Sequence, residues 1–460
     1  MHKALQAIVF VLLAIQVSAQ LQAAEAQQNL LDIYQLALAG DPTLASAQAG
    51  NTAAQEKQVQ GKALLLPNVG LSANASQLHT DADFPGQKSA ATPTIAANNS
   101  HYVDDWNSYG YKLSVSQPLF RKQNWVSYEQ SKNQVAQSDE QLKAAVQDLV
   151  LRVAQAYFDL LLAQDTVELN TAQQAAIANQ FEQAKVSFEV GTATITDVND
   201  AQAKHDQVVA DGIVAKNDVE VKKQAVVRII GQLPQRIAVL QEKPTLKPVD
   251  PSGMDEWVKI GEAQNLQMKI QQKALEIATQ EVEKATAGHY PTLDLVANYN
   301  KDDANGSNIG SVGRRYIDTA DIGLQFQVPL YQGGAISSRV REAVANQQKA
   351  RDDFEAARRQ ADFEIQQAFL AATNGLSLVK AVEQAVVSTQ SSLDSTKLGY
   401  EVGVRTSVDV LNSQQQYFTA KRDLLRARYI FLLSKLKLKA AAGLLAEADL
   451  TEINQLLIKP

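Results

Sequence analysis

The chain has 460 residues, of which 45% are hydrophobic and only 6% aromatic, which argues against one large apolar core. It contains no cysteine, which excludes disulfides, thiolate metal sites, cysteine nucleophiles and cysteine-linked lipid anchors. The net charge is −7 without any run rich in Lys or Arg, so we expect no nucleic-acid partner. Past the N-terminus no apolar run reaches the length of a spanning helix, which excludes a helical membrane protein but not a β-barrel.

The N-terminus has the pattern of a secretory signal peptide, predicted over residues 1–26. A short positive start precedes the apolar run from Ala4 to Val17, and small residues allow cleavage after Ala19 or Ala26. The apolar run is too short to span a membrane comfortably. A secreted chain without cysteine fits the periplasm or outer membrane of a Gram-negative bacterium.

The next predicted elements are helices followed by two strands. Residues 29–65 are helix-rich, with an interruption at Gly40-Asp41-Pro42, where a helix would stop. After Pro67 apolar residues alternate with polar ones in two stretches, at Leu71, Ala73 and Ala75 and at Tyr111, Leu113 and Val115. This period of two predicts strands with one apolar and one polar face.

A very long helix is predicted from Phe120 to Phe188, because this stretch has no Pro or Gly and its apolar residues recur at helical spacing. At about 1.5 Å per residue it would measure roughly 100 Å. A lone helix of this polarity would not be stable, so we expect coiled-coil-like packing. Residues 231–251 then hold four prolines and predict a linker that no helix crosses.

The second half of the chain repeats this order. Phe188-Glu189-Val190-Gly191 matches Tyr400-Glu401-Val402-Gly403 at an offset of 212 residues, and Pro118 matches Pro329 at an offset of 211. Apolar residues alternate again in two stretches, at Leu293, Leu295, Ala297 and Tyr299 and at Ile322, Leu324, Phe326 and Val328. Another long helix is predicted from Ala335 to Leu398.

These matches predict a tandem duplication, with residues 27–234 as the first repeat, 235–253 as a Pro-rich linker and 254–460 as the second repeat. Pro67 and Pro291 lie 224 residues apart, so the first half has 13 extra residues before Pro118, which predict a longer loop there.

Four strands cannot close a membrane barrel, and an open edge in lipid would leave backbone groups unpaired at several kcal/mol each. Closure must therefore come from further copies of the chain. Eight strands from two copies would be filled by side chains, whereas twelve strands from three copies would leave a channel. We therefore expect a homotrimer.

Ordered motifs across the mature chain resemble the TolC family of outer-membrane efflux proteins. They are Asn29-Leu30-Leu31-Asp32-Ile33-Tyr34, Asp41-Pro42, Leu65-Leu66-Pro67, Gln117-Pro118-Leu119-Phe120, Val190-Gly191 with Thr196-Asp197-Val198, Pro291-Thr292-Leu293-Asp294-Leu295, Pro329-Leu330-Tyr331-Gln332-Gly333-Gly334 and Val402-Gly403 with Asp409-Val410-Leu411. Each motif alone is weak, but their ordered recurrence in two halves is specific.

The resemblance implies an α+β membrane protein in which a long α-helical barrel in the periplasm continues a transmembrane antiparallel β-barrel. Four strands per chain would be closed by trimerisation. The implied function is a passive exit duct for tripartite efflux or type I protein secretion, with no enzymatic activity and no cofactor. The implied partners are outer-membrane lipid, a periplasmic adaptor and an inner-membrane ABC or proton-driven pump.

The resemblance also implies a gate at the periplasmic turns of the helical hairpins. Its latch would join Arg405 to Asp197 or Thr196, with Tyr400 bonding across to Gln180 or Asp197. A guanidinium holds a carboxylate with directed bonds, yet an exposed pair is worth only about 0–1 kcal/mol, so a pump complex could release it. Two solvated charges near a turn are the alternative.

Asp409 would give three carboxylates around one axis, and like charges at close range raise their pKa values and attract cations. Asn412 stands where the family pattern has a second Asp, so we expect weaker block by multivalent cations, although Asn412 could still narrow the pore.

Other interpretations fit less well. A secreted helical filament without transport activity does not need four amphipathic strands, and an adaptor would carry one helical hairpin. Asp302, Asp303, Asn305 and Gly306 resemble a calcium loop that lacks its closing Glu. His79 and His101 fall in the predicted loop between the first two strands, where an acidic solvated loop is favoured over a metal site.

Overall fold

The computed structural model describes residues 28–84, 100–305 and 314–458, so the predicted signal peptide lies outside it. The chain divides into two compact units. We call Met1–Thr52, Gln137–Gln272 and Asp353–Pro460 the helical unit, and Ala53–Ala136 with Lys273–Asp352 the sheet unit. Within the described ranges, every helix is too short or too polar to span a bilayer.

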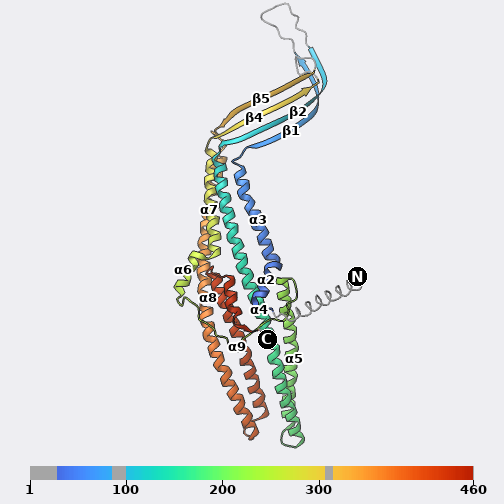
Figure 1. Cartoon of the computed structure of the whole chain (residues 1–460), viewed down its shortest axis with the longest axis vertical. Coiled ribbons are helices and arrows are strands. Elements are labelled where there is room, and N and C mark those ends of the chain that lie inside the picture. Colours follow the sequence, from blue (N-terminus) through green and yellow to red (C-terminus); the bar gives the residue numbers. More distant parts are fainter. Residues whose placement is uncertain (1–27, 85–99, 306–313, 459–460) are drawn as a thin grey trace, which may run out of the picture. The chain divides into compact units, whose positions relative to one another are not determined.

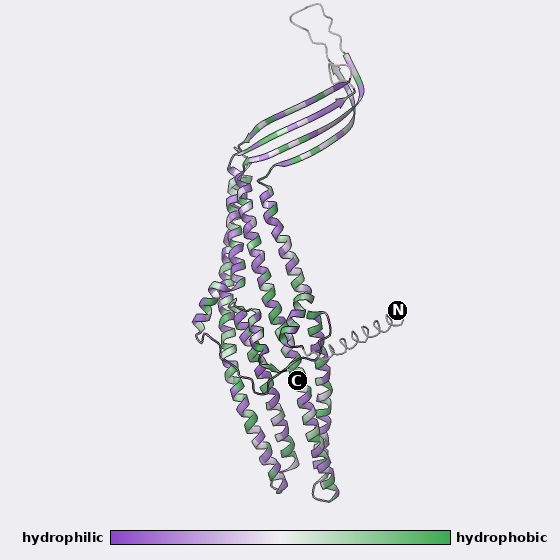
Figure 2. Ribbon diagram, viewed as in Figure 1, coloured by the Kyte–Doolittle hydropathy of each residue, from purple (hydrophilic) through white to green (hydrophobic). Residues whose placement is uncertain are grey.

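The sheet unit contains four antiparallel strands in the order β1-β2-β4-β5 (Figure 1), formed by Asn68–Phe84, Ser100–Phe120, Thr292–Ala304 and Arg315–Gln327. All four predicted strands are therefore confirmed. Hydrophobic and hydrophilic residues alternate along them (Figure 2) because successive side chains point to opposite faces. Leu71 and Ile322 are both 75% exposed on one face, where a soluble sheet would bury such side chains.

The strand register places these apolar side chains in rows across the sheet. Leu71 of β1 lies opposite Leu113 of β2, which lies opposite Tyr299 of β4. In the described chain β1 and β5 are the outer strands, and each has one neighbour. The sheet thus has an exposed apolar face and two free edges.

The first strand pair is longer than the second. β1 and β2 span 17 and 21 residues, whereas β4 and β5 span 13 each, so part of the extra length lies in the strands. The segment between β1 and β2, in which a longer loop is expected, lies outside the described residues, so that expectation stays a prediction. His79 and His101 consequently lie in β1 and β2 rather than in a loop. His79 Nδ1 lies 2.8 Å from Asp105 Oδ1, and His101 Nδ1 lies 3.5 Å from Asp81 Oδ1.

An ion pair between a half-exposed arginine and a buried carboxylate holds the base of the sheet. Arg121 Nε donates to Asp294 Oδ1 at 2.8 Å, and its terminal nitrogen donates to Asp294 Oδ2. Asp294 is buried at the start of β4, and Arg121 links β2 to α4 (Lys122–Glu189). The two parallel hydrogen bonds fix the orientation of the guanidinium and also pair its positive charge with the carboxylate.

The helical unit contains most of two long helical hairpins, α4 with α5 (Ile195–Ile230) and α8 (Ala335–Glu401) with α9 (Ser407–Ala441) (Figure 1), whereas the first turns of α4 and α8 belong to the sheet unit. The long helices confirm the predicted ones. The predicted break near Pro42 is also confirmed, because α2 (Leu30–Gly40) ends there and α3 (Pro42–Ala63) begins. Arg152 of α4 holds buried Asp41 at this break, with its two terminal nitrogens 2.7 and 3.1 Å from the carboxylate oxygens.

The core of this unit joins both hairpins. Phe158 of α4 stacks on Tyr429 of α9 with ring centroids 5.7 Å apart. The Tyr429 hydroxyl donates to Asp165 Oδ2 at 2.6 Å. Burial raises the pKa of Asp165 to about 6, although this hydrogen bond opposes the shift.

The predicted linker is free of helix between Ile230 and Met254, but it is not structureless. β3 (Val239–Leu240) pairs with β6 (Leu457–Ile458) at the C-terminus, and the Tyr157 hydroxyl donates to the Ala238 carbonyl at 2.7 Å. After the linker come α6 (Met254–Gln264) and α7 (Leu266–Thr286). Sequence periodicity missed the β3–β6 pair because its strands are two residues long and far apart in the chain.

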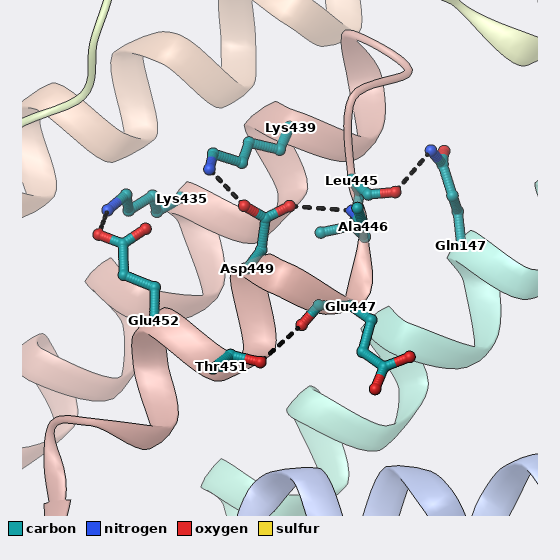
Figure 3. A network of polar contacts seen from close by, with 9 residues as sticks. All are labelled: Gln147, Lys435, Lys439, Leu445, Ala446, Glu447, Asp449, Thr451 and Glu452. Atoms are coloured by element: carbon teal, nitrogen blue, oxygen red, sulfur yellow. Dashed lines mark hydrogen bonds and ion pairs between the residues drawn. The ribbon is translucent and has the colours of Figure 1, made fainter.

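Two ion pairs fasten α10 (Glu447–Asn454) to α9 (Figure 3). Lys435 Nζ lies 2.8 Å from Glu452, and Lys439 pairs with Asp449. The lysines are one helical turn apart and so present both ammonium groups to the same short helix. Gln147 of α4 adds a 3.0 Å bond to the Leu445 carbonyl, so the C-terminal segment is held by both hairpins.

Candidate functional site

The ends of the two hairpins, which we call the tips, are built alike. Gly191 and Gly403 have φ values of 78° and 79°, a left-handed conformation that glycine adopts without penalty. The following residue donates its backbone N–H back into the helix in each case, Thr192 to Ser187 at 2.8 Å and Val404 to Gly399 at 2.9 Å. These contacts end α4 and α8 and reverse the chain.

Each second helix then starts with a capping box. In α5 the Asp197 carboxylate accepts from the Thr194 backbone at 2.9 Å and from its hydroxyl at 2.8 Å. In α9 Asp409 accepts from both Thr406 groups at 2.9 Å. The Thr406 backbone N–H, its hydroxyl and nearby Arg405 hold the pKa of Asp409 below its ordinary value. The rise of this pKa expected from neighbouring copies stays a prediction.

A cavity of 1120 Å³ lies between the tips, entirely within the helical unit. Four residues of the predicted latch line it, namely Gln180, Asp197, Tyr400 and Arg405. No ion pair joins Arg405 to Asp197 in the described chain, and Asp197 instead caps its own helix. The latch therefore stays a prediction for the assembled protein.

Three other predicted residues lie outside this cavity. Thr196 is exposed on the first turn of α5, and Asp409 caps α9. Asn412 is exposed and lines a separate cavity of 530 Å³ with Val382 of α8 and Asp423 of α9. The cavity thus brings together four of the five predicted latch residues, whereas Thr196 and both predicted constriction residues lie outside it.

Gly399 positions the Arg405 side chain, which sequence reasoning missed. A Cβ at Gly399 would lie 2.7 Å from Cγ of Arg405, too close for two carbon atoms. The absence of that Cβ lets the Arg405 stem lie flat on the end of α8. The matched position in the first repeat is Ser187, so the two tips differ here.

The tips pack against each other through a small apolar cluster. It is formed by buried residues of α4, α5 and α9, namely Ile177, Ala184, Ala201, Val208 and Leu411. Lys204 of α5 also donates to Gln415 of α9 at 2.9 Å. Polar Gln180, Ser407 and Gln414 are buried beside this cluster and line the cavity. In the sequence, the only signal for this buried face of α9 is the spacing of three and four residues that runs from Ser407 to Gln414.

Relatives with known names cover nearly the whole chain. The chain is 33% identical to outer membrane protein TolC of Vibrio cholerae, covering 93% of each chain. It is 31% identical to TolC of Escherichia coli, over 94% of this chain and 86% of that protein. It is 30% identical to the alkaline protease secretion protein AprF of Pseudomonas aeruginosa, over 92% and 86%.

Solved structures share the fold. The Campylobacter jejuni CmeC outer membrane channel superposes with a TM-score of 0.76 at 19% identity, over 93% of this chain and 89% of that chain. VceC of Vibrio cholerae gives a TM-score of 0.72 at 22% identity, over 90% and 96%. The sequence also matches the family described as "Outer membrane efflux protein" over residues 33–232 and 257–444. The chain therefore belongs to the outer membrane efflux protein family.

Proposed function

We propose that this protein is the outer-membrane exit duct of tripartite efflux or type I secretion systems, and that it works as a homotrimer. Each chain contributes four strands to a transmembrane β-barrel and its long hairpins to a helical barrel in the periplasm. The protein acts as a passive conduit, in keeping with relatives that are named as outer membrane and secretion proteins.

The observation that carries this proposal is the four-stranded sheet with an exposed apolar face and two free edges. Lipid stabilises such a face but cannot pair the edges. Three copies pair each β1 edge with a β5 edge of the next copy and so close a ring of twelve strands. A secreted filament is the weaker alternative, because it gives the apolar strand face no role.

The partners follow from the same architecture. A passive duct needs a pump for energy, so we propose an inner-membrane ABC or proton-driven pump, joined through a periplasmic adaptor to the hairpin tips. The relatives' names point to both kinds of cargo, since one is a protease secretion protein and the family is described by efflux. We retain residues 27–234 and 254–460 as the two repeats, joined by 235–253.

Reconstitution tests the proposal directly. The purified protein should insert into planar lipid bilayers and give discrete ion-conducting steps, and cell fractionation should place it in the outer membrane. Protein recovered outside the cell as fibres, with no conductance in bilayers, would support the filament instead.

A gene deletion identifies the cargo. Drug susceptibility and the secreted proteome should be measured in the same deletion strain. Increased susceptibility alone assigns the duct to efflux, and loss of a secreted protein alone assigns it to secretion.

A further inference from the structure

The contact between the tips has polar residues at both ends of a short apolar stripe. Near its start α9 buries Ser407, Val410, Leu411 and Gln414, which share one helix face. The next buried residue of α9 is Ala427, so the stripe ends at Gln414. From α4, Ile177, Gln180 and Ala184 face the same contact. We call this contact the tip seam.

Three side chains of the tip seam bury polar atoms without a protein partner. Gln180, Ser407 and Gln414 are 6%, 3% and 4% exposed. Their Nε2, Oγ and Oε1 atoms, respectively, make no hydrogen bond in the described chain, and all three residues line the 1120 Å³ cavity. A buried polar group without a partner disfavours the packed state, and a polar residue in a coiled-coil seam fixes register while weakening the contact.

The internal repeat shows what these positions do outside a seam. At the offset of 212 residues, Gln180, Ser407 and Gln414 correspond to Ser392, Ile195 and Gln202. All three counterparts are exposed, as is Asn199, the counterpart of buried Leu411. The same positions in the same hairpin geometry are therefore compatible with exposure to water.

We infer that Gln180, Ser407 and Gln414 set how readily the two hairpins part along the tip seam. Val410 and Leu411 hold the seam closed by excluding water. The flanking polar groups gain water when the hairpins separate, so they favour the parted state. This inference rests on the proposed duct function. It gives Gln180 a role opposite to the one that the predicted latch assigns to it, and it adds Ser407 and Gln414 as residues that favour parting.

Single-channel recording in planar bilayers tests the inference. Gln414→Leu removes the unpartnered Oε1 atom at similar side-chain volume and should lower the open-to-closed ratio about five- to thirtyfold. Leu411→Ala should raise that ratio. Gln202→Leu is the matched control, since it makes the same change at the exposed counterpart, and it should leave the ratio unchanged. An unchanged or raised ratio in Gln414→Leu overturns the inference.

A second measurement separates this inference from the proposed function. The chain has no cysteine, so Val190→Cys and Val402→Cys, both at exposed positions, allow spin labels on the two tips. Adding Gln414→Leu, or Gln180→Met if the former does not fold, should shift the label distances toward the packed population. An unshifted distribution overturns the seam inference, whereas a wild-type protein without conductance contradicts only the duct.

Discussion

Arg405 carries a guanidinium that has no ion-pair or hydrogen-bond partner in the described part of the chain. Arg405→Ser should raise single-channel conductance if it belongs to the latch, and Tyr400→Phe should do the same by removing one hydroxyl. An exposed ion pair is worth about 0–1 kcal/mol, so the equilibrium constant between the open and closed states should shift toward the open state by up to about fivefold. Arg405→Lys keeps the charge without the planar fork and should give an intermediate value. Wild-type conductance in both variants would remove these residues from the latch.

Asn412 tests the role of ring charge. Asn412→Asp adds a carboxylate about one helical turn from Asp409 and should strengthen block by multivalent cations, because charged rings attract counter-ions. Titrating a trivalent cation against single-channel current measures the effect, with Asn412→Gln as the neutral control. Equal block in Asp and Gln variants would contradict the prediction.

The buried carboxyl group of Asp165 should make the free energy of unfolding of this protein depend on pH. Its pKa rises from 3.8 to about 6 on folding, so the folded chain binds this proton more tightly than the unfolded chain does. Stability from this group is therefore fully present below pH 4 and is lost as the pH rises to about 6. The loss amounts to at most about 3 kcal/mol.

Chemical denaturation across this pH range checks the prediction. Asp165→Asn can still accept the Tyr429 hydroxyl and should flatten the profile. Asp206→Asn, at an exposed carboxylate, is the control and should keep the wild-type slope. If the free energy of unfolding of Asp165→Asn still falls with rising pH, the pH dependence belongs to another titratable group.

Among the elements, a substitution at Gly399 near the end of α8 tests the predicted latch without replacing any of its charged residues. Gly399→Ala places a methyl group 2.7 Å from Arg405 Cγ and displaces the guanidinium stem. Conductance should rise, in the same direction as in Arg405→Ser. Gly375→Ala is the matched control on α8, because its Cβ would make an ordinary 3.5 Å contact with Phe431. A rise in Gly375→Ala would show that any change in α8 loosens the tip.

The helices, strands and tips could be predicted because each leaves a local pattern. Helical spacing marks α4, alternation marks β4, and the glycine at position 191 recurs at position 403. The contact of Arg405 with Gly399 and the burial of Gln414 could not be predicted, since they depend on how two hairpins pack. The latch partner of Arg405 stays a prediction, since the described part of the chain shows no ion pair of this residue.

At the scale of the whole molecule, the free strand edges predict the oligomer. Mass measurement in mild detergent should give three copies of the mature chain, because three times four strands close a ring wide enough for a channel. A stable monomer or dimer at working concentration would rule out the trimer. Deleting β5 should abolish the trimer, because the β1 edge of the next copy then loses its partner.

The capping boxes restrict how this protein can vary over evolutionary time. Asp197 and Asp409 each start a helix as well as carrying a charge at the tip, so changing either residue risks unwinding the first turn. Asn412 lies inside α9 and does not cap the helix. Adaptation of the duct to new ions or cargo is therefore expected at position 412 and its exposed neighbours, while helix capping favours a side chain that accepts hydrogen bonds at position 409.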